Sequence, residues 1–244
     1  MLANYPLAQN SAIFDKDAFE LEHNEQLVDA VENRSRSFFF VKRFIDILFS
    51  LVIVLLILSW LMPILAILIK LDSRGPIFFK QKRTGYKGKT FNCFKLRSMK
   101  VNKNANDLQA ALNDPRITRM GKFLRVSNLD ELPQFINVLI GDMSIVGPRP
   151  HMLADSEHFS DIFPGYYNRY LVKPGITGLA QINGFRGPTP SIRSIYKRLQ
   201  WDLYYVEHAT IGMDIQIILL TALETLREAL KVKVIKKMPF SRYR

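Results

Sequence analysis

The sequence predicts an α/β protein in a loose sense, mainly helical with a small sheet, in which one helix enters a membrane. An uncharged run from Ile47 to Ile69, twenty-three residues long, is sufficient to cross a bilayer. Apolar residues recur at helical spacing in several later segments, whereas only two short pieces, Ile77–Phe79 and Phe91–Phe94, have strand character. At 244 residues, the chain is long enough for one main core beside the membrane segment.

The charge balance indicates an anionic partner without identifying it. Thirty-four Lys and Arg residues against twenty-two Asp and Glu residues give a formal net charge of +12. Nucleic acid, a phosphorylated ligand and an anionic membrane face all fit that charge. Cys93 is the only cysteine, which excludes an intrachain disulfide and a zinc site built from several cysteines.

We expect four consecutive segments along the chain. Residues 1–37 are polar and lack a clear period, which is typical of a loosely ordered extension. Residues 38–72 contain the membrane helix, and residues 73–231 form the main folded domain. Residues 232–244 are a basic tail.

The flanks of the membrane run favour a re-entrant helix. Basic residues lie on both sides of it: Arg34, Arg36, Lys42 and Arg43 before it, and Lys70, Arg74, Lys80, Lys82 and Arg83 after it. Since cytoplasmic flanks carry the Lys and Arg excess, both ends are expected on the same side of the membrane. Pro63 breaks the helical hydrogen-bond pattern, with Ser59 one turn earlier, so the chain can bend there and return. A single tilted transmembrane helix that tolerates Pro63 remains the alternative.

A basic β-hairpin is predicted over Gly75–Met99. Its two apolar pieces flank a turn at Gly85–Gly88, and its edges carry cations: Lys80, Lys82, Arg83, Lys89, Lys95 and Arg97. By composition, a solvated hairpin and a phosphate-facing hairpin are equally compatible with this pattern.

A helix with an acidic start follows in VSNLDELPQFINVL. One face is apolar, formed by Leu132, Phe135, Ile136, Leu139 and Ile140. Pro133 is acceptable only in a first turn, so Asp130 and Glu131 lie at the helix start, and Gly141 ends the helix.

The acidic pair has two interpretations. A carboxylate at a helix start commonly caps free backbone N–H groups. Adjacent side chains point about 100° apart on a helix, however, so Asp130 and Glu131 cannot both cap equally. One carboxylate could attack phosphorus while the other holds Mg²⁺, with arginines neutralising the phosphate charge.

Three further segments complete the domain. In DMSIVGPRPH, Pro148 and Pro150 bracket Arg149 in a stiff turn, and the glycine-rich KPGITGLAQINGFRGPT is typical of an ordered functional loop. A helix is expected from about Ser191 to His208. Another is expected over 214–230, either as an interfacial helix beside anionic lipids or as a core helix.

Several ordered motifs resemble the bacterial sugar transferase family, the monotopic polyprenyl-phosphate phosphoglycosyl transferases. They span about three quarters of the chain: KRFID, LDSRGPIFFKQKRTG, FKLRSM, SNLDELPQ, GDMSIVGPRP, KPGITGLAQINGFRG and DLYYV. The resemblance is to the short, undecaprenyl-phosphate hexose-1-phosphate transferase-like form, with residues 1–37 in place of a further transmembrane block. Leu179 and Phe185 depart from it, because many relatives have a tryptophan and a polar residue there.

The resemblance implies a membrane helix broken at Pro63 and an Asp-Glu dyad, with Asp130 as nucleophile and Glu131 helping to bind Mg²⁺. It implies that Asp130 attacks a UDP-sugar, expected to be UDP-glucose or UDP-galactose, and that UMP leaves. The phospho-sugar then passes to undecaprenyl phosphate and starts a capsule, exopolysaccharide or other surface glycan. Expected phosphate and nucleotide contacts are Arg149, Arg83, Arg97, Lys173 and Gly175, whereas Asp202 in DLYY fits either a functional or a structural role.

The same resemblance places the protein at the bacterial inner membrane, with its catalytic domain on the cytoplasmic face. It implies no nucleic-acid partner and is compatible with a homodimer. The competing hypothesis is a membrane-anchored basic binding module, in which Asp130 and Glu131 are plain caps and no UMP is released.

Overall fold

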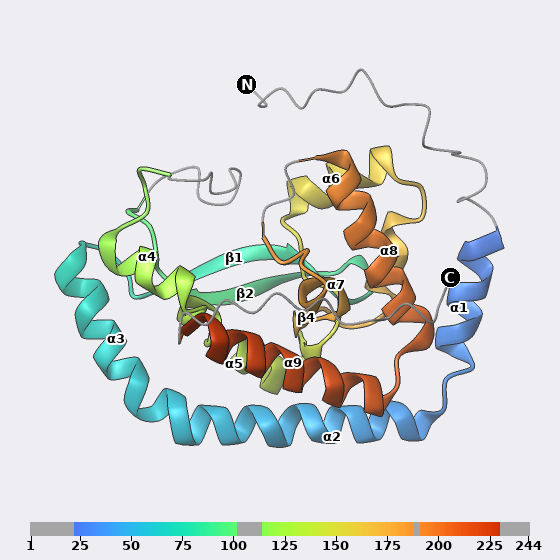
Figure 1. The fold of residues 1–244 in the computed structure, drawn as a ribbon, viewed down its shortest axis with the longest axis horizontal. Helices are drawn as coiled ribbons and strands as arrows, with labels where there is room; N and C mark the ends of the chain where they lie inside the picture. Colours follow the sequence, from blue (N-terminus) through green and yellow to red (C-terminus); the bar gives the residue numbers. More distant parts are fainter. Residues whose placement is uncertain (1–21, 102–113, 188–190, 230–244) are drawn as a thin grey trace.

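The computed structural model describes residues 22–101, 114–187 and 191–229 (Figure 1). The expected extension up to residue 21 and the basic tail at 232–244 therefore lie outside the described residues. The elements in chain order are α1 (Glu22–Glu32), α2 (Arg36–Ile53), a π-helix (Val54–Leu58), α3 (Ser59–Asp72), β1 (Phe78–Thr84), a 3-10 turn (Tyr86–Gly88), β2 (Thr90–Leu96), α4 (Arg119–Val126), a 3-10 turn (Leu129–Glu131), α5 (Gln134–Ile140), β3 (Ser144–Val146), α6 (Leu153–Ile162), a 3-10 segment (Tyr166–Leu171), β4 (Gly175–Thr177), α7 (Leu179–Ile182), α8 (Ile192–His208) and α9 (Ile211–Ala229).

One long apolar helical segment, Arg36–Asp72, is bent near its middle. In Figure 1, α2 runs along the lower edge and α3 turns upward from it, with the π-helix between them. The Ser59 hydroxyl donates to the carbonyl of Leu55 at 2.6 Å, and Pro63, which has no N–H, lies inside α3. Since π-turns and interior prolines both bend helices, the irregular turn at Val54–Leu58, directly before Ser59, accounts for the bend together with Pro63.

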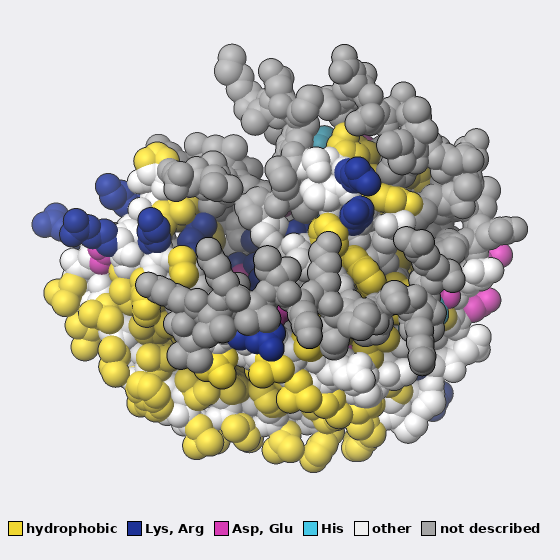
Figure 2. Space-filling model, viewed as in Figure 1, with side chains coloured by type: hydrophobic (Ala, Val, Ile, Leu, Met, Phe, Trp, Pro, Cys, Tyr) yellow, Lys and Arg dark blue, Asp and Glu magenta, His cyan; other side chains and the backbone are white. Residues whose placement is uncertain are grey.

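The outer face of this bent helix is apolar and exposed. Only 17% of its most apolar window is buried, so it is not the core helix of a soluble domain. Figure 2 shows hydrophobic side chains along the lower edge and the left side of the molecule, where α2 and α3 lie. The exposed side chains include Phe40, Phe44, Leu48, Leu55, Leu56, Trp60, Ile67 and Leu71, and α9 adds Leu219, Leu223 and Leu226. A surface this apolar is suited to lipid rather than water.

The KRFID motif fastens α2 to the rest of the fold. Arg43 donates to two last-turn carbonyls of α5, at 2.6 and 2.9 Å. Asp46 accepts from the backbone N–H of Ile145 in β3 at 3.0 Å, and Lys42 forms an ion pair with Asp214 of α9 at 2.6 Å. These contacts tie α2 to α5, β3 and α9, and α5 and β3 are the elements that flank the acidic pair and Arg149.

The strands form two small sheets instead of the single one expected. β1 and β2 make the predicted antiparallel hairpin, with Phe78 opposite Leu96. β3 and β4 pair in parallel, with Ser144 opposite Gly175. Each of these two strands has three residues, which is too short for an alternating pattern to show in the sequence.

Two hydrophobic clusters support the fold. The larger one joins α5, α6, α8 and the 3-10 segment through buried aromatic and aliphatic side chains such as Phe163, Tyr170 and Leu199. Leu27 of α1 is buried in the same cluster, so residues 22–32 are an ordered helix and not a loosely ordered extension. A short polar helix of this kind is stabilised by tertiary packing more than by its own propensity.

The predicted helix behind the acidic pair is divided in two. Asp130 and Glu131 lie in a 3-10 turn, and α5 begins only at Gln134, because Pro133 takes the N-cap position. α5 ends at Gly141 as expected, where φ is 98°. The expected helix after Ser191 is confirmed as α8, which starts with a capping box at that serine.

Candidate active site

The acidic pair is held by a tight turn between α4 and α5. Asn128 adopts a left-handed conformation with φ 57°, and its carbonyl accepts from the backbone N–H of Glu131 at 3.2 Å. Neither carboxylate caps a helix, because the 3-10 turn has no side-chain cap and α5 begins after Pro133. Both side chains are instead buried at the wall of a cavity, with Asp130 8% and Glu131 7% exposed.

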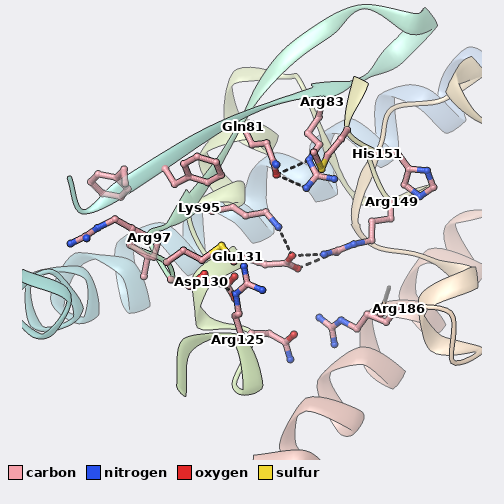
Figure 3. Close-up of a pocket in the computed structure, with 18 of the residues that line it drawn as sticks. Gln81, Arg83, Lys95, Arg97, Arg125, Asp130, Glu131, Arg149, His151 and Arg186 are labelled. Atoms are coloured by element: carbon pink, nitrogen blue, oxygen red, sulfur yellow. Dashed lines mark hydrogen bonds and ion pairs between the residues drawn. The ribbon is translucent and has the colours of Figure 1, made fainter. Parts of the chain in front are cut away.

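Glu131 is paired with two cations. Its Oε1 accepts from Lys95 Nζ at 2.8 Å and from Arg149 Nη2 at 2.5 Å, and its Oε2 accepts from Arg149 Nη1 at 3.1 Å (Figure 3). Burial opposes ionisation of Glu131, but the charges of Arg149 and Lys95 outweigh it and hold its pKa well below the usual range. Glu131 is therefore an ionised anchor for both cations.

Asp130 has the opposite environment. Within the described part of the chain, its carboxylate has no hydrogen-bond or ion-pair partner. Burial raises its pKa, while the nearby charges of Lys95, Arg125 and Arg149 act in the other direction. A buried carboxylate that is free of partners and surrounded by cations is suited to nucleophilic attack on an anionic electrophile.

The cavity beside the pair has a volume of about 540 Å³, which fits a substrate of nucleotide size. Its lining is strongly basic: Arg83, Lys95, Arg97, Lys100, Arg125, Arg149, Arg186 and Arg198, against Asp130, Glu131 and Asp155. Figure 3 shows the labelled side chains converging on this space from β1, β2, α4 and the turn Gly147–Pro150, which we call the GPRP turn. Cations that converge on one concave cavity favour a compact phosphorylated ligand over an extended nucleic acid.

Arg149 is positioned by a buried network behind it. Arg169 Nη2 donates to the backbone carbonyl of Arg149 at 2.9 Å and to Asp202 Oδ2 at 2.5 Å. The Arg169 and Asp202 side chains are 0% and 2% exposed. The sequence left a functional and a structural role open for Asp202. In the structure, Asp202 binds Arg169, and Arg169 in turn binds the backbone of the GPRP turn at Arg149.

The GPRP turn also depends on close backbone packing against the loop Lys173–Gly178, which we call the KPGITG loop. A Cβ atom on Gly147 would lie 2.3 Å from the carbonyl oxygen of Lys173, and one on Gly175 would lie 2.1 Å from the amide nitrogen of Gly147. No residue with a side chain fits at these distances. Gly175 therefore acts through its backbone, since it pairs with Ser144 and supports the turn that carries Arg149.

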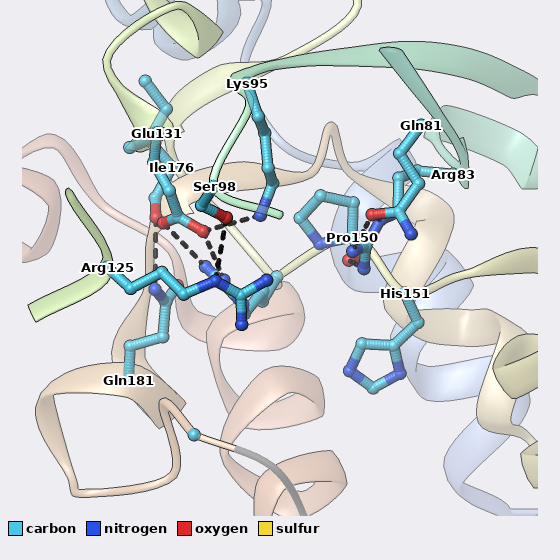
Figure 4. A network of polar contacts seen from close by, with 12 residues as sticks. Gln81, Arg83, Lys95, Ser98, Arg125, Glu131, Pro150, His151, Ile176 and Gln181 are labelled. Atoms are coloured by element: carbon cyan, nitrogen blue, oxygen red, sulfur yellow. Dashed lines mark hydrogen bonds and ion pairs between the residues drawn. The ribbon is translucent and has the colours of Figure 1, made fainter. Parts of the chain in front are cut away.

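Two other residues predicted to bind phosphate, Arg83 and Arg97, both line the cavity but bind different parts of the chain. Arg83 lines the cavity, where it donates to the carbonyl of Pro150 at 2.9 Å and to Gln81 (Figure 4). Arg97 also lines the cavity, but its guanidinium donates to the carbonyls of Ser73 at 2.7 Å and Pro76 at 2.6 Å. Arg97 thus holds the chain that leaves α3.

Lys173 and Gly175, which were expected near the nucleotide, are not among the residues that line the cavity. Burial and the neighbouring charge of Arg43 lower the pKa of Lys173. The backbone of both residues packs on Gly147, and the Lys173 ammonium lies near Gly141 at the end of α5.

Among the charged and titratable residues that line the cavity, seven were not singled out as site residues from the sequence: Lys95, Lys100, Arg125, His151, Asp155, Arg186 and Arg198. One signal was available for Lys95, because Arg97 directly follows the strand that carries Lys95, and alternation places these two side chains on the same face. Arg198 approaches the cavity from α8, where it donates to His151 Nε2 at 3.3 Å, and no local pattern connects the two positions.

The donor set fits Mg²⁺ bound together with a phosphorylated substrate. Among the described residues, no group of three or more His, Cys, Asp or Glu side chains could hold a metal ion alone. Mg²⁺ commonly takes one or two carboxylates and completes its shell with phosphate oxygens and water. Glu131 uses three of about four acceptor positions, and Asp130 uses none, so both retain capacity for a cation.

Comparison with known proteins gives a consistent family. The model of the family described as "Bacterial sugar transferase" matches residues 37–228. The chain is 51% identical over 177 residues to the UDP-glucose:undecaprenyl-phosphate glucose-1-phosphate transferase of Xanthomonas campestris pv. campestris, covering 72% of this chain and 37% of that protein. It is 50% identical over 182 residues to the Escherichia coli (strain K12) protein of the same name, covering 74% and 39%.

One relative matches this chain over almost its whole length. The chain is 45% identical over 191 residues to the exopolysaccharide production protein PSS of Rhizobium leguminosarum bv. phaseoli, covering 76% of this chain and 95% of that protein. By contrast, the match spans less than two fifths of the length of the Xanthomonas and Escherichia relatives. The family match, the two carboxylates and the basic cavity agree, and the chain belongs to the bacterial sugar transferase family.

Proposed function

We propose that this chain transfers a sugar-1-phosphate from a UDP-sugar to undecaprenyl phosphate and releases UMP. The observation that carries the proposal is the partnerless, buried Asp130 carboxylate beside the Glu131–Arg149–Lys95 cluster in a basic cavity. The names of the relatives support this reaction class, with glucose as their sugar. UDP-glucose or UDP-galactose is the expected donor.

The reaction proceeds in two displacements. An oxygen of Asp130 attacks the β-phosphorus of the UDP-sugar, the bond from that phosphorus to the bridging oxygen breaks, and UMP leaves with the bridging oxygen. An oxygen of undecaprenyl phosphate then attacks the phosphorus of the aspartyl phospho-sugar, and the bond to Asp130 breaks. The product is an undecaprenyl-diphosphate sugar, and the Asp130 carboxylate is regenerated.

The cations of the cavity stabilise charge during both displacements. Arg149 offers a planar guanidinium whose orientation Glu131 fixes before a substrate arrives. Lys95 adds a second positive charge on the same carboxylate. Asp130 and Glu131 would hold Mg²⁺, which supplies neutralisation of the diphosphate when bound.

The membrane arrangement belongs to the same proposal. The bent helix of residues 38–72 is re-entrant, with the basic flanks on one side of the membrane and the domain of residues 73–231 on the cytoplasmic face of the bacterial inner membrane. The exposed apolar surface of α2, α3 and α9 supports this placement. The product would start exopolysaccharide, capsule or another surface glycan, in line with the name of the Rhizobium relative.

UMP release tests the proposal. Purified protein in nanodiscs with Mg²⁺ and undecaprenyl phosphate is given UDP-glucose, UDP-galactose, UDP-GlcNAc and UDP-GalNAc in turn, with and without EDTA. We expect release with one donor, and its loss in EDTA and in Asp130→Asn, which preserves size but removes the nucleophile. The exposed acid Asp161 on α6 provides the control Asp161→Asn, which should retain activity.

Two results would contradict the proposal. Activity that survives in Asp130→Asn would overturn the choice of nucleophile. Absence of UMP with every donor would favour the membrane-anchored binding module, in which the acidic pair has no chemical role.

A further inference from the structure

The cavity has two chemically different ends. One end carries the charged or titratable side chains of His151, Asp155, Arg186 and Arg198, and its apolar lining residues, Met152 and Phe159, are buried. The other end has an apolar rim, which we define as Pro76, Phe78, Val101 and Val126. In Figure 3, Arg97 lies on the side opposite His151 and Arg186, so the two ends are separated in space.

The apolar rim is exposed although it borders a basic cavity. Phe78 is 46%, Val101 67% and Val126 69% exposed. Isolated exposed apolar residues are ordinary, but three of them around one cavity opening form a surface that a ligand can cover. The uracil ring of a UDP-sugar can stack on one aromatic ring such as Phe78, but a UDP-sugar has no aliphatic chain that would cover Val101 and Val126 as well.

The apolar rim adjoins the end of the membrane helix. α3 ends at Asp72, and Arg97, itself a cavity residue, binds the carbonyl of Pro76 at the start of the rim. Val126 is the last residue of α4, and α4 packs on α3 through Leu124. The rim is thus continuous with the part of the fold that carries the exposed apolar side chains of the membrane helix.

A second cation lies between the rim and the nucleophile. Arg125, adjacent to Val126, donates from Nε to the Ser98 hydroxyl at 2.8 Å. Within the described residues, Nη1 and Nη2 of Arg125 have no hydrogen-bond partner. In Arg149, by contrast, both Nη1 and Nη2 donate to Glu131. Figure 3 shows Arg125 beside Asp130. Arg125 can therefore receive an anion other than the one that meets Arg149.

We infer that the apolar rim and Arg125 form the binding site for the acceptor lipid, a polyisoprenyl phosphate. Its phosphate binds Arg125 within reach of Asp130, and the first isoprene units cover Phe78 and Val126 on the way to the bilayer. This inference rests on the proposed function. A lipid whose tail stays in the membrane can present its phosphate only at an opening beside the membrane surface, and the apolar rim is at such a place.

Kinetics of the two half-reactions provide the first test. Val126→Asn and Phe78→Ser are made in the full chain, with Val52→Asn and Phe44→Ser as matched controls on the exposed face of α2. We expect the KM for undecaprenyl phosphate to rise about tenfold in each rim variant, from loss of roughly one buried apolar side chain. UMP release in a single turnover without acceptor should stay unchanged, because it needs only the donor.

A binding measurement separates this inference from the proposed function. Cys93 is the only cysteine and is buried, so Val126→Cys introduces one accessible thiol for an environment-sensitive fluorophore. Undecaprenyl phosphate in nanodiscs should shift the emission at this position and leave that of Val52→Cys unchanged, whether or not the protein releases UMP. Inorganic phosphate and farnesyl phosphate serve as probes of the headgroup and of a short tail.

The outcomes decide the question in either direction. A shift with undecaprenyl phosphate that weakens with farnesyl phosphate and vanishes with inorganic phosphate supports the site. An equal shift with inorganic phosphate, no shift with any probe, or an unchanged acceptor KM in both rim variants would overturn it. A lipid-induced shift in a protein that releases no UMP would retain the lipid site and reject the transferase function.

Discussion

Arg149 and Glu131 form a two-point ion pair at the cavity wall, with Nη1 donating to Oε2 at 3.1 Å and Nη2 donating to Oε1 at 2.5 Å. The pair fixes the plane of the guanidinium and keeps Glu131 ionised. Because Asp202 and Arg169 hold the backbone of Arg149 from behind, the side chain and the main chain of this arginine are fixed independently. A preorganised cation of this kind needs no rearrangement when phosphate charge develops.

Arg149→Lys should therefore lower kcat/KM for the UDP-sugar by about 100-fold, although the positive charge is retained. A lysine ammonium is a point charge and cannot make the two-point contact. Single-turnover UMP release measures the effect. Arg193→Lys, at an exposed position of α8, is the control and should match the native rate. A rate for Arg149→Lys within about twofold of native would show that charge alone is sufficient.

Asp202→Ala should unfold the protein more easily, since it leaves Arg169 buried without its carboxylate partner. Breaking a buried ion pair costs about 3–5 kcal/mol, which corresponds to a fall in Tm of roughly 6–20 °C for a chain of this size. Thermal unfolding in detergent micelles measures it. Replacing both partners, Arg169→Met with Asp202→Leu, should recover much of the Tm, because no unpaired charge remains.

Activity distinguishes the positioning role of this pair from a purely structural one. The double variant loses the hydrogen bond from Arg169 to the carbonyl of Arg149, so its kcat should stay low even where its Tm recovers. Full recovery of both quantities together would show that the network stabilises the fold without positioning Arg149.

The sequence predicted the features that depend on local pattern. Ser59 and Pro63 predicted a bend in the apolar helix, and the π-helix lies directly before Ser59. The turn at Gly85–Gly88 located the hairpin, and Ser191 located the start of α8. The adjacent carboxylates were found as a pair, but their placement in a 3-10 turn was not, because Pro133 was assigned to the first turn and not to the N-cap.

Long-range contacts could not be predicted in the same way. Arg97 was expected to bind phosphate, and its position in a basic hairpin gives no sign that five hydrogen bonds hold it to the chain around the end of α3. The family resemblance implied that Lys173 lies near the nucleotide, but Lys173 does not line the cavity, and its carbonyl packs on Gly147. Both cases depend on partners that lie far away in sequence or on the main chain, which single-sequence patterns do not encode.

The stability of the protein should depend on His151 in acid. Arg198 donates to Nε2, so the ring proton lies on Nδ1 and is donated to Tyr166. Burial, reinforced by the charges of Arg169 and Arg198, holds the pKa of His151 well below 6.5. The unfolded chain therefore binds a proton that the folded protein excludes, and stability falls as the pH drops below about 6.5.

The expected loss from this one group is about 1 kcal/mol between pH 6.5 and 5.5. Tm measured across this range in the native protein and in His151→Gln should show a shallower acid decline in the variant. His208, which is exposed at the end of α8, gives the control His208→Gln with an unchanged decline. Parallel curves for the native protein and His151→Gln would indicate that His151 titrates normally in the fold.

The contact between the GPRP turn and the KPGITG loop gives the last prediction. A methyl group at Gly175 would lie 2.1 Å from the amide nitrogen of Gly147 and 2.3 Å from the carbonyl oxygen of Thr177, and neither backbone atom can move without separating β3 from β4. Gly175→Ala should destabilise the protein by about 1–3 kcal/mol or more and displace Arg149, so Tm and kcat should fall together. In the control Gly212→Ala, the added methyl would meet only the Thr210 hydroxyl at 3.9 Å, so Tm should be unchanged or slightly higher. Normal kcat in Gly175→Ala despite a lower Tm would show that the turn keeps Arg149 in place without this close packing.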